Sequence, residues 1–81
     1  MNMSNLIKYK KAFAESLSLK DSLINDKLEY ESVPEWDSIG HMSLMSSLEQ
    51  TFKISISTDD VVEFSSFKKG KTILKKYKVK V

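Results

Sequence analysis

Apolar residues near the start of the chain repeat at the spacing of an α-helix. Four of them follow one another at steps of three and four positions: Leu6, Tyr9, Phe13 and Leu17. Residues three and four apart lie on the same side of a helix. We therefore predict a helix over residues 3–18 with this row facing the core.

Residues 18–37 interrupt the helical pattern. Serine, aspartate, asparagine and the single proline, Pro34, separate the apolar positions here. A segment of this length inside a compact domain is expected to be ordered by contacts with the core. We predict a long structured connection whose apolar side chains turn inward, namely Leu23, Ile24, Leu28 and Val33.

The clearest helical pattern runs over residues 38–53. Its apolar residues step by three, three, three and four positions, with Leu44 widening the row: Ile39, Met42, Met45, Leu48 and Phe52. Asp37 or Ser38 is a suitable N-cap, because a short side-chain oxygen accepts a hydrogen bond from an unpaired amide of the first turn. The two methionines are expected in the core, or else lining an adaptable apolar cavity.

Two shorter helices are predicted after an extended loop that turns Ile54 and Ile56 inward, since a single strand would have no partner. Serine and threonine caps precede helices over residues 59–64 and 66–77. Their expected buried residues are Val61, Val62, Phe64, Phe67, Ile73 or Leu74, and Tyr77. Gly70 weakens the last helix by about 1 kcal/mol unless close packing requires it. The tail, residues 78–81, is expected to fray.

These patterns predict one all-α domain over residues 1–81, a small four-helix bundle with a long first loop and a short third helix. A chain of 81 residues has room for a single small core. The residues expected in this core, or lining an apolar cavity within it, are Phe13, Leu48, Phe52, Ile56, Phe64 and Phe67.

Charge is segregated along the chain although the net charge is only +2. Residues 1–20 carry four lysines and one glutamate, residues 21–52 one lysine and seven acids, and residues 53–81 eight lysines and three acids. An acidic middle between basic ends suggests a partner that recognises the middle electrostatically. Solvated helix faces would give the same clusters.

Composition excludes several kinds of site and location. The chain has no cysteine, so no disulfide, thiolate nucleophile or zinc–thiolate site is possible. Lysines interrupt the apolar positions of the first twenty residues, which argues against a signal peptide or a membrane-spanning segment. We expect a cytoplasmic monomer with no membrane partner.

Catalytic and metal-binding motifs are missing from the pattern. Ser38 has the single histidine, His41, three residues later, but no third group is placed to orient that ring. Asp59 and Asp60 lack the glycine and the spaced ligands of a calcium loop, and no glycine-rich phosphate loop occurs. We predict no catalytic residue and no metal site, and His41 is expected to be a surface residue of its helix.

Ser38 therefore stands at a predicted helix N-terminus, where free amides and the helix dipole favour a negatively charged group such as a phosphodiester. The string DSIGHMSLMSSLEQTFKISI, residues 37–56, resembles the acyl carrier protein family in its Asp-Ser-hydrophobic start, its Leu-Glu pair, its phenylalanine and its extended isoleucines. The likeness continues through TDDVVEFSSF, residues 58–67. It covers residues 33–76 closely and the first helix loosely.

The resemblance implies a four-helix carrier fold and a non-catalytic function. A separate phosphopantetheinyl transferase, with magnesium, would attach the 4'-phosphopantetheine arm of coenzyme A to Ser38. The thiol of the arm would then hold an acyl or aminoacyl group as a thioester for a ligase, a synthase or an acyltransferase. The docking surface for these partners would comprise Asp37, Ile39, Gly40, His41, Met42, Met45 and Glu49.

The chain departs from the fatty-acid carriers of this family in its charge. Gly40 and Ser43 occupy positions that are commonly acidic, and only Glu49 is acidic along that helix. The lead-in of Pro34, Glu35 and Trp36 is more similar to free-standing carriers of specialised pathways or to peptidyl carriers. We therefore expect the main fatty-acid synthase not to be the principal partner.

Two other functions fit parts of the pattern. The same fold, with Ser38 unmodified, would serve as a helical protein-interaction module. The lysines between residues 68 and 80 would suit a small nucleic-acid-binding module, but the absence of arginine and the acidic middle argue against it.

Overall fold

The computed structural model describes residues 4–81 and contains four α-helices in that range: α1 (Asn5–Leu17), α2 (Ser38–Phe52), α3 (Thr58–Glu63) and α4 (Phe67–Lys75). A 3-10 turn, η1 (Asp21–Leu23), lies between α1 and α2. Over residues 4–81 there is no strand, and the only sheet-like pairing is an isolated bridge between Glu29 and Ser66. The predicted all-α, four-helix architecture is confirmed at this level, while the predicted start at residue 3 lies outside the described residues.

All four helices begin at short polar side chains, as the sequence predicts for α2, α3 and α4. In every case a side-chain oxygen accepts from an amide three residues later, and the four N-caps are Ser4, Asp37, Ser57 and Ser66. Two helices, α1 and α2, end at residues in the left-handed conformation, Ser18 and Lys53. The caps account for unpaired amides that otherwise destabilise short helices.

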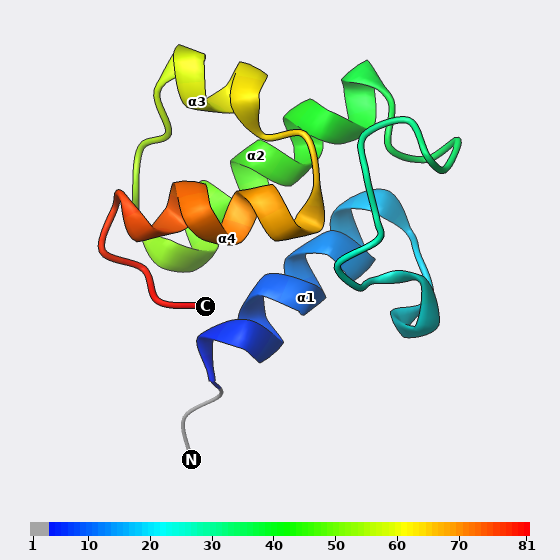
Figure 1. Ribbon diagram of the computed structural model, residues 1–81, viewed down its shortest axis with the longest axis horizontal. Coiled ribbons are helices and arrows are strands. Elements are labelled where there is room, and N and C mark those ends of the chain that lie inside the picture. Colours follow the sequence, from blue (N-terminus) through cyan, green and yellow to red (C-terminus); the bar gives the residue numbers. More distant parts are fainter. Residues whose placement is uncertain (1–3) are drawn as a thin grey trace.

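The core is built around Phe13 on α1, which is fully buried. Its ring lies 5.0 Å from Tyr9, 5.3 Å from Trp36, 5.0 Å from Phe67 and 6.2 Å from Phe64, measured between centroids. We call these five residues the aromatic cluster. It joins α1, the long connection, the α3–α4 loop and α4, and α2 packs along α1 beside it (Figure 1).

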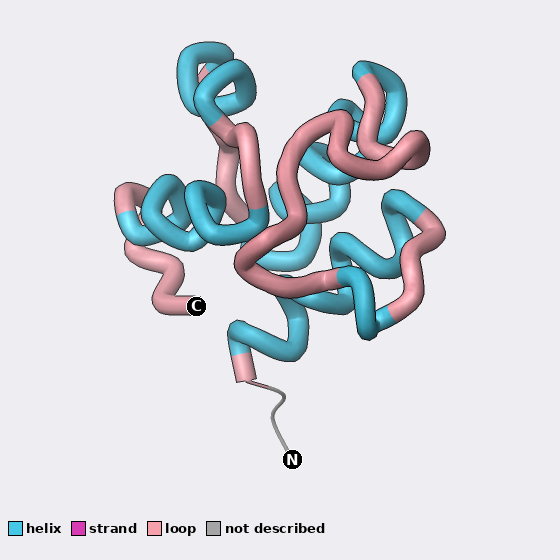
Figure 2. The backbone as a smooth tube through the Cα atoms, turned by 45° about the vertical axis from the view of Figure 1, so that its right-hand side comes forward, coloured by secondary structure: helices cyan, strands magenta, loops and turns pink. Residues whose placement is uncertain are grey.

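The connection between α1 and α2 is ordered, as predicted. It places Ile24, Leu28 and Trp36 in the core. It is also tied to the start of α4, where the Phe67 amide donates to the Leu28 carbonyl at 2.9 Å. Figure 2 shows this segment as a long loop interrupted by one short helical turn, η1. The prediction for Leu23 is wrong, since its side chain is 47 % exposed in η1.

Gly70 lies where α4 crosses the aromatic cluster, and no side chain fits there. A Cβ atom built at this position would overlap the Tyr9 hydroxyl and the Phe64 ring. That hydroxyl donates to the Phe67 carbonyl at 2.7 Å. Burial raises the pKa of Tyr9 well above its usual value, and the charge of Asp26 adds to the rise. The glycine is therefore required by close packing.

Several apolar residues predicted to be buried are exposed. Ile39 is 81 % exposed, Met42 60 %, Val62 75 % and Leu6 41 %. Each residue turns a helix by about 100°, so three steps of three residues place Ile39 about 180° from Leu48. A row built from steps of three therefore leaves the buried face, which on α2 carries Leu44, Met45 and Leu48.

The prediction that the C-terminal tail frays is wrong, because the tail packs against the rest of the protein. Val79 is buried and Val81 is half-buried. The side-chain amide of Asn5 donates to the Lys80 carbonyl at 2.9 Å. This bond ties the tail to the first turn of α1, and the sequence contained no signal for a contact across 75 positions.

We predict that Gly70→Ala destabilises the protein although alanine favours helices. The change gains about 1 kcal/mol of helix propensity, but overlap with Tyr9 and Phe64 should cost more than this gain, within the roughly 1–3 kcal/mol usual for overpacking. Urea unfolding should show a net loss of up to about 2 kcal/mol. Thr72→Ala, at an exposed site on α4, is the matched control and should be neutral or stabilising; a stabilised Gly70 variant would contradict the packing at this crossing.

Candidate functional site

Ser38 is the first residue of α2 and is exposed. The cap is made by its neighbour, because the Asp37 carboxylate accepts from the Gly40 amide at 2.8 Å. The sequence alone allowed either Asp37 or Ser38 to be the N-cap. Ser38 Oγ takes no part in the cap, and the hydroxyl of Tyr30 lies 3.4 Å from it. The helix start is thus stabilised without using the serine hydroxyl.

Trp36 anchors the chain just before Ser38. Its side chain is fully buried and packs edge-on against Phe13. Its carbonyl accepts from the Glu31 amide at 2.9 Å, which closes the loop that leads into α2. A large buried side chain two residues away holds Ser38 in place on the surface.

Gly40 is held close to the same loop. A Cβ atom here would overlap the Glu35 carbonyl oxygen and press on the Leu17 side chain. Gly40 therefore has no space for an acidic side chain. Gly40 is also half-buried, so it adds little to the predicted docking surface.

His41 is half-buried and bonded through both ring nitrogens, so the prediction of a surface residue is wrong. The indole N–H of Trp36 donates to His41 Nδ1 at 2.9 Å, and His41 Nε2 lies 2.8 Å from the Val61 carbonyl. An indole nitrogen only donates, so Nδ1 accepts and Nε2 carries the proton. Both nitrogens are engaged by other groups, and the ring is therefore not placed to act as a base for Ser38.

A pocket of about 240 Å³ opens beside Ser38 between α2 and α3. Its lining residues are Tyr30, His41, Val61, Val62, Phe64 and Ser65. Tyr30 connects the pocket to the serine, since its hydroxyl lies 3.4 Å from Ser38 Oγ. The walls are mostly apolar, and the hydroxyls of Tyr30 and Ser65 add polar groups.

Three apolar side chains, Ile39, Met42 and Val62, are exposed on α2 and α3. They are 81 %, 60 % and 75 % exposed, respectively. Ile39 and Met42, like Asp37, are therefore accessible as the predicted docking surface requires. Val62 was missed because the sequence pattern assigned it to the core.

Two of the predicted docking residues, Met45 and Glu49, are not available to partners on the surface. Met45 is only 3 % exposed and belongs to the core. The Glu49 carboxylate is half-buried and accepts from the Ile56 amide at 2.8 Å, so it fixes the loop after α2. The predicted docking roles of Met45 and Glu49 are therefore wrong, because each side chain is committed to packing or to an internal bond.

The six residues predicted for the core or an apolar cavity all contact the core. Phe13, Leu48, Ile56, Phe64 and Phe67 are buried, and Phe52 is partly buried against them. All six therefore belong to the hydrophobic core cluster or pack against it.

The helix α3 is tied to the end of α4 through Asp60, a link that the sequence pattern did not predict. Its carboxylate is buried and accepts from Lys76 Nζ and from the Tyr77 hydroxyl, each at 2.5 Å. The hydrogen bond from Lys76 lowers the pKa of Asp60 most, and the bond from Tyr77 lowers it further. No local sequence signal identifies these partners, which lie 16 and 17 residues away.

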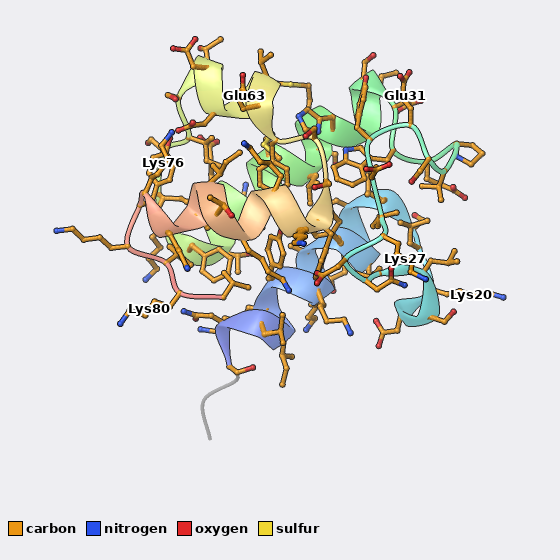
Figure 3. The ribbon with its side chains drawn as sticks, viewed as in Figure 1. Lys20, Lys27, Glu31, Glu63, Lys76 and Lys80 are labelled. Carbon is orange, nitrogen blue, oxygen red and sulfur yellow. The ribbon has the colours of Figure 1, made fainter. Side chains whose placement is uncertain are left out.

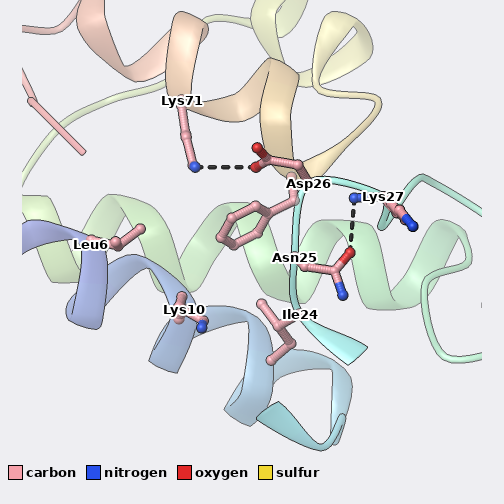
Figure 4. Close-up of a pocket in the computed structure, with 8 residues that line it drawn as sticks. Leu6, Lys10, Ile24, Asn25, Asp26, Lys27 and Lys71 are labelled. Carbon is pink, nitrogen blue, oxygen red and sulfur yellow. Dashed lines mark hydrogen bonds and ion pairs between the residues drawn. The ribbon is translucent and has the colours of Figure 1, made fainter. Parts of the chain in front are cut away.

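A second pocket, of about 470 Å³, lies between α1, the long connection and α4 (Figure 4). Lysines at positions 10, 27 and 71 surround an apolar floor that includes Ile24. Asp26 pairs with Lys71 at 3.1 Å. Nothing in this lining resembles a nucleophile with its base.

Charge is distributed unevenly over the molecule. Figure 3 shows Glu31 and Glu63 toward the edge formed by the start of α2 and by α3, and Lys20, Lys27 and Lys80 toward α1 and the C-terminal tail. Within residues 4–81, no group of three or more histidine or acidic side chains is arranged to hold a metal ion. No helix among these described residues is long and apolar enough to cross a membrane.

Comparison of the chain with protein-family models, with curated proteins and with solved structures gave no significant match. The functional interpretation therefore depends on the residues and their geometry.

We predict that Asp60 makes the free energy of unfolding depend on pH. A carboxylate whose pKa is lowered by folding stabilises the native state above its unfolded pKa of about 3.9, and this contribution is lost as the pH falls through the lowered native value. Asp60→Asn should therefore be less stable than wild type at pH 7. The difference should shrink below about pH 4.

Thermal unfolding of wild type and variant between neutral and strongly acidic pH measures this difference. Asp59→Asn is the matched control, because Asp59 is its exposed neighbour on the same helix. A constant gap between wild type and Asp60→Asn at every pH would contradict the assignment of an ionised, bonded carboxylate.

Proposed function

We propose that this chain is a carrier protein of the acyl carrier type, which holds a 4'-phosphopantetheine arm on Ser38. The arm carries an acyl or aminoacyl group as a thioester, and partner enzymes load, modify or remove that group. The chain has no catalytic role of its own. Its contribution is to present one hydroxyl at a fixed place on a stable surface.

The observation that carries this proposal is the exposed hydroxyl of Ser38, which is left out of the helix cap. Asp37 makes the cap in its place, at 2.8 Å from the Gly40 amide. A serine used only to start the helix would itself accept that bond. The arrangement leaves Ser38 Oγ for reaction without loss of the helix start.

The site also suits a covalently bound phosphodiester. The first turn of α2 directs amides and the positive end of the helix dipole toward the start of the helix, which favours a negative charge there. Asp37 already occupies the Gly40 amide, so the helix dipole is what would favour the phosphate of the arm here. In the attachment reaction Ser38 Oγ forms a bond to the arm's phosphorus, the phosphoanhydride bond of coenzyme A breaks, and the nucleotide leaves. The transferase supplies the base and the magnesium.

The fold supports the same proposal. Four helices with a long first connection and a short third helix are the architecture that the sequence resemblance implies. The exposed Ile39, Met42 and Val62 offer partners an apolar surface around Ser38. Met45 and Glu49 are withdrawn from that surface by their internal contacts. Recognition by partners would depend more on apolar contact than on a row of acids, which is consistent with a specialised pathway.

An unmodified interaction module remains the second candidate. The exposed apolar residues on α2 and α3 favour it, because they would suit a protein partner whether or not Ser38 is modified. A nucleic-acid-binding role is less well supported. The lysine at position 71 is paired with Asp26, and Lys76 is paired with Asp60.

We predict that a broad-specificity phosphopantetheinyl transferase, with coenzyme A and magnesium, adds one phosphopantetheinyl group to the purified chain. Intact-mass measurement should show one addition in wild type and none in Ser38→Ala. The variant should remain folded, with an unfolding free energy within about 0.5 kcal/mol of wild type, because an exposed side chain outside the cap is removed.

Ser43→Ala removes another exposed hydroxyl of α2 and is the control that should still be modified. Failure of wild type to be modified would favour the unmodified interaction module. Addition at another serine would reject Ser38 as the attachment site.

A further inference from the structure

The short helix α3 is held by polar links in addition to the partly buried Val61, which packs against the core. Its only buried side chain is that of Asp60, while Val62 is 75 % exposed. Asp60 ties it to the end of α4 through Lys76 and Tyr77. On the other side, the Val61 carbonyl is bonded to His41 on α2 at 2.8 Å. In Figure 2 this helix stands at the upper edge with a loop on either side.

The link through His41 continues into the core. The ring of His41 stacks on Trp36, with an angle of 22° between the planes and 6.1 Å between centroids. It also meets Tyr30 and Phe64 edge-on, at 5.4 and 6.2 Å. Trp36 itself is immobilised by full burial against Phe13. The chain of contacts therefore runs from the aromatic cluster through Trp36 and His41 to the backbone of α3.

The position of α3 fixes two features beside Ser38. Val61 and Val62 form one wall of the 240 Å³ pocket, and Tyr30 and His41 line it from the other elements. The same position sets how far the exposed Val62 lies from Ile39 and Met42 on α2. A change in the bond between His41 and Val61 would alter the pocket and the apolar surface together.

We propose that His41 is a positioning residue, which holds α3 against α2 through its neutral Nε2–H tautomer and so sets the shape of the surface that partners meet beside Ser38. Trp36 selects this tautomer, because its indole N–H can only donate to Nδ1. The proposal concerns the arrangement of α3 and rests on the proposed function only where it concerns partner enzymes.

Two substitutions separate the two bonds of His41. In His41→Gln, the longer side chain keeps an N–H donor near the place of Nε2, so the bond to Val61 is retained. In His41→Asn, the shorter side chain keeps an acceptor near the place of Nδ1, so the bond to Trp36 is retained and that to Val61 is lost. Ser43→Gln and Ser43→Asn, at an exposed site on α2, give the effect of the same residues on helix propensity alone.

The first experiment uses the unmodified protein. Nitrogen-15 NMR of the histidine ring should show the Nε2–H tautomer in wild type. Amide hydrogen exchange in residues 60–64 should be about fivefold to tenfold faster in His41→Asn than in wild type, as expected for the loss of one hydrogen bond. Exchange in α1 should be unchanged, and His41→Gln should restore slow exchange in α3.

Three results would overturn the proposal: the Nδ1–H tautomer, equal exchange in the Gln and Asn variants after correction by the Ser43 pair, or faster exchange spread evenly over all helices.

The second experiment measures attachment of the phosphopantetheinyl arm. The His41→Asn variant should show an apparent KM raised about fivefold with kcat unchanged, since docking and not chemistry is altered, and His41→Gln should restore KM.

The two experiments fail independently. If wild type accepts no arm, the proposed function fails, while NMR and exchange still decide whether His41 positions α3. If exchange changes but KM does not, His41 holds α3 without shaping the surface that this partner uses, and that part of the proposal is rejected.

Discussion

The burial of Trp36 against Phe13 is the constraint on which the rest of the structure depends. Trp36 is fully buried in the aromatic cluster, although it belongs to a connection and not to a helix. A side chain of this size is among the largest apolar contributions in a small core. Its position fixes where the connection ends, where Asp37 caps α2 and where Ser38 reaches the surface. The loop then lies so close to α2 that Gly40 has no space for a side chain.

The same residue joins the apolar core to the polar links that hold α3. Its indole N–H orients His41, and His41 reaches the Val61 carbonyl. On the far side of α3, Asp60 makes bonds to Lys76 and Tyr77. The helix α3 is therefore positioned by directional bonds as well as by the apolar contact of Val61 with the core. Ser38, held in place by the buried Trp36, therefore lies beside a helix whose position depends on few bonds.

The sequence predicted the local features well and the long-range features poorly. Helix positions and caps follow from apolar spacing and from short polar residues, and α2 was placed within one residue at each end. The faces of the helices were harder to predict, because steps of three residues drift around the helix axis and carried Ile39 and Met42 out of the core. Val62 was misassigned because α3 turns Asp60 and Val61 toward the rest of the protein and leaves Val62 exposed.

Other features of the site depend on contacts between distant parts of the chain. The engagement of His41 by Val61 and the tie of Asn5 to Lys80 leave no periodic signal in the sequence. Ser38 could be singled out, by its place before a strong helical pattern. That its hydroxyl is spared from capping could be seen only in the structure, because Asp37 and Ser38 are equally good caps on sequence grounds.

We propose that Ser38 is the attachment point of a phosphopantetheine arm in the living cell. The most direct measurement is the mass of the peptide containing Ser38, obtained from the protein isolated from the cells that naturally produce it. We expect this peptide to be heavier by one phosphopantetheinyl group, with fragmentation placing the group on Ser38. A peptide of unmodified mass in every preparation, from cells with an active transferase, would contradict it.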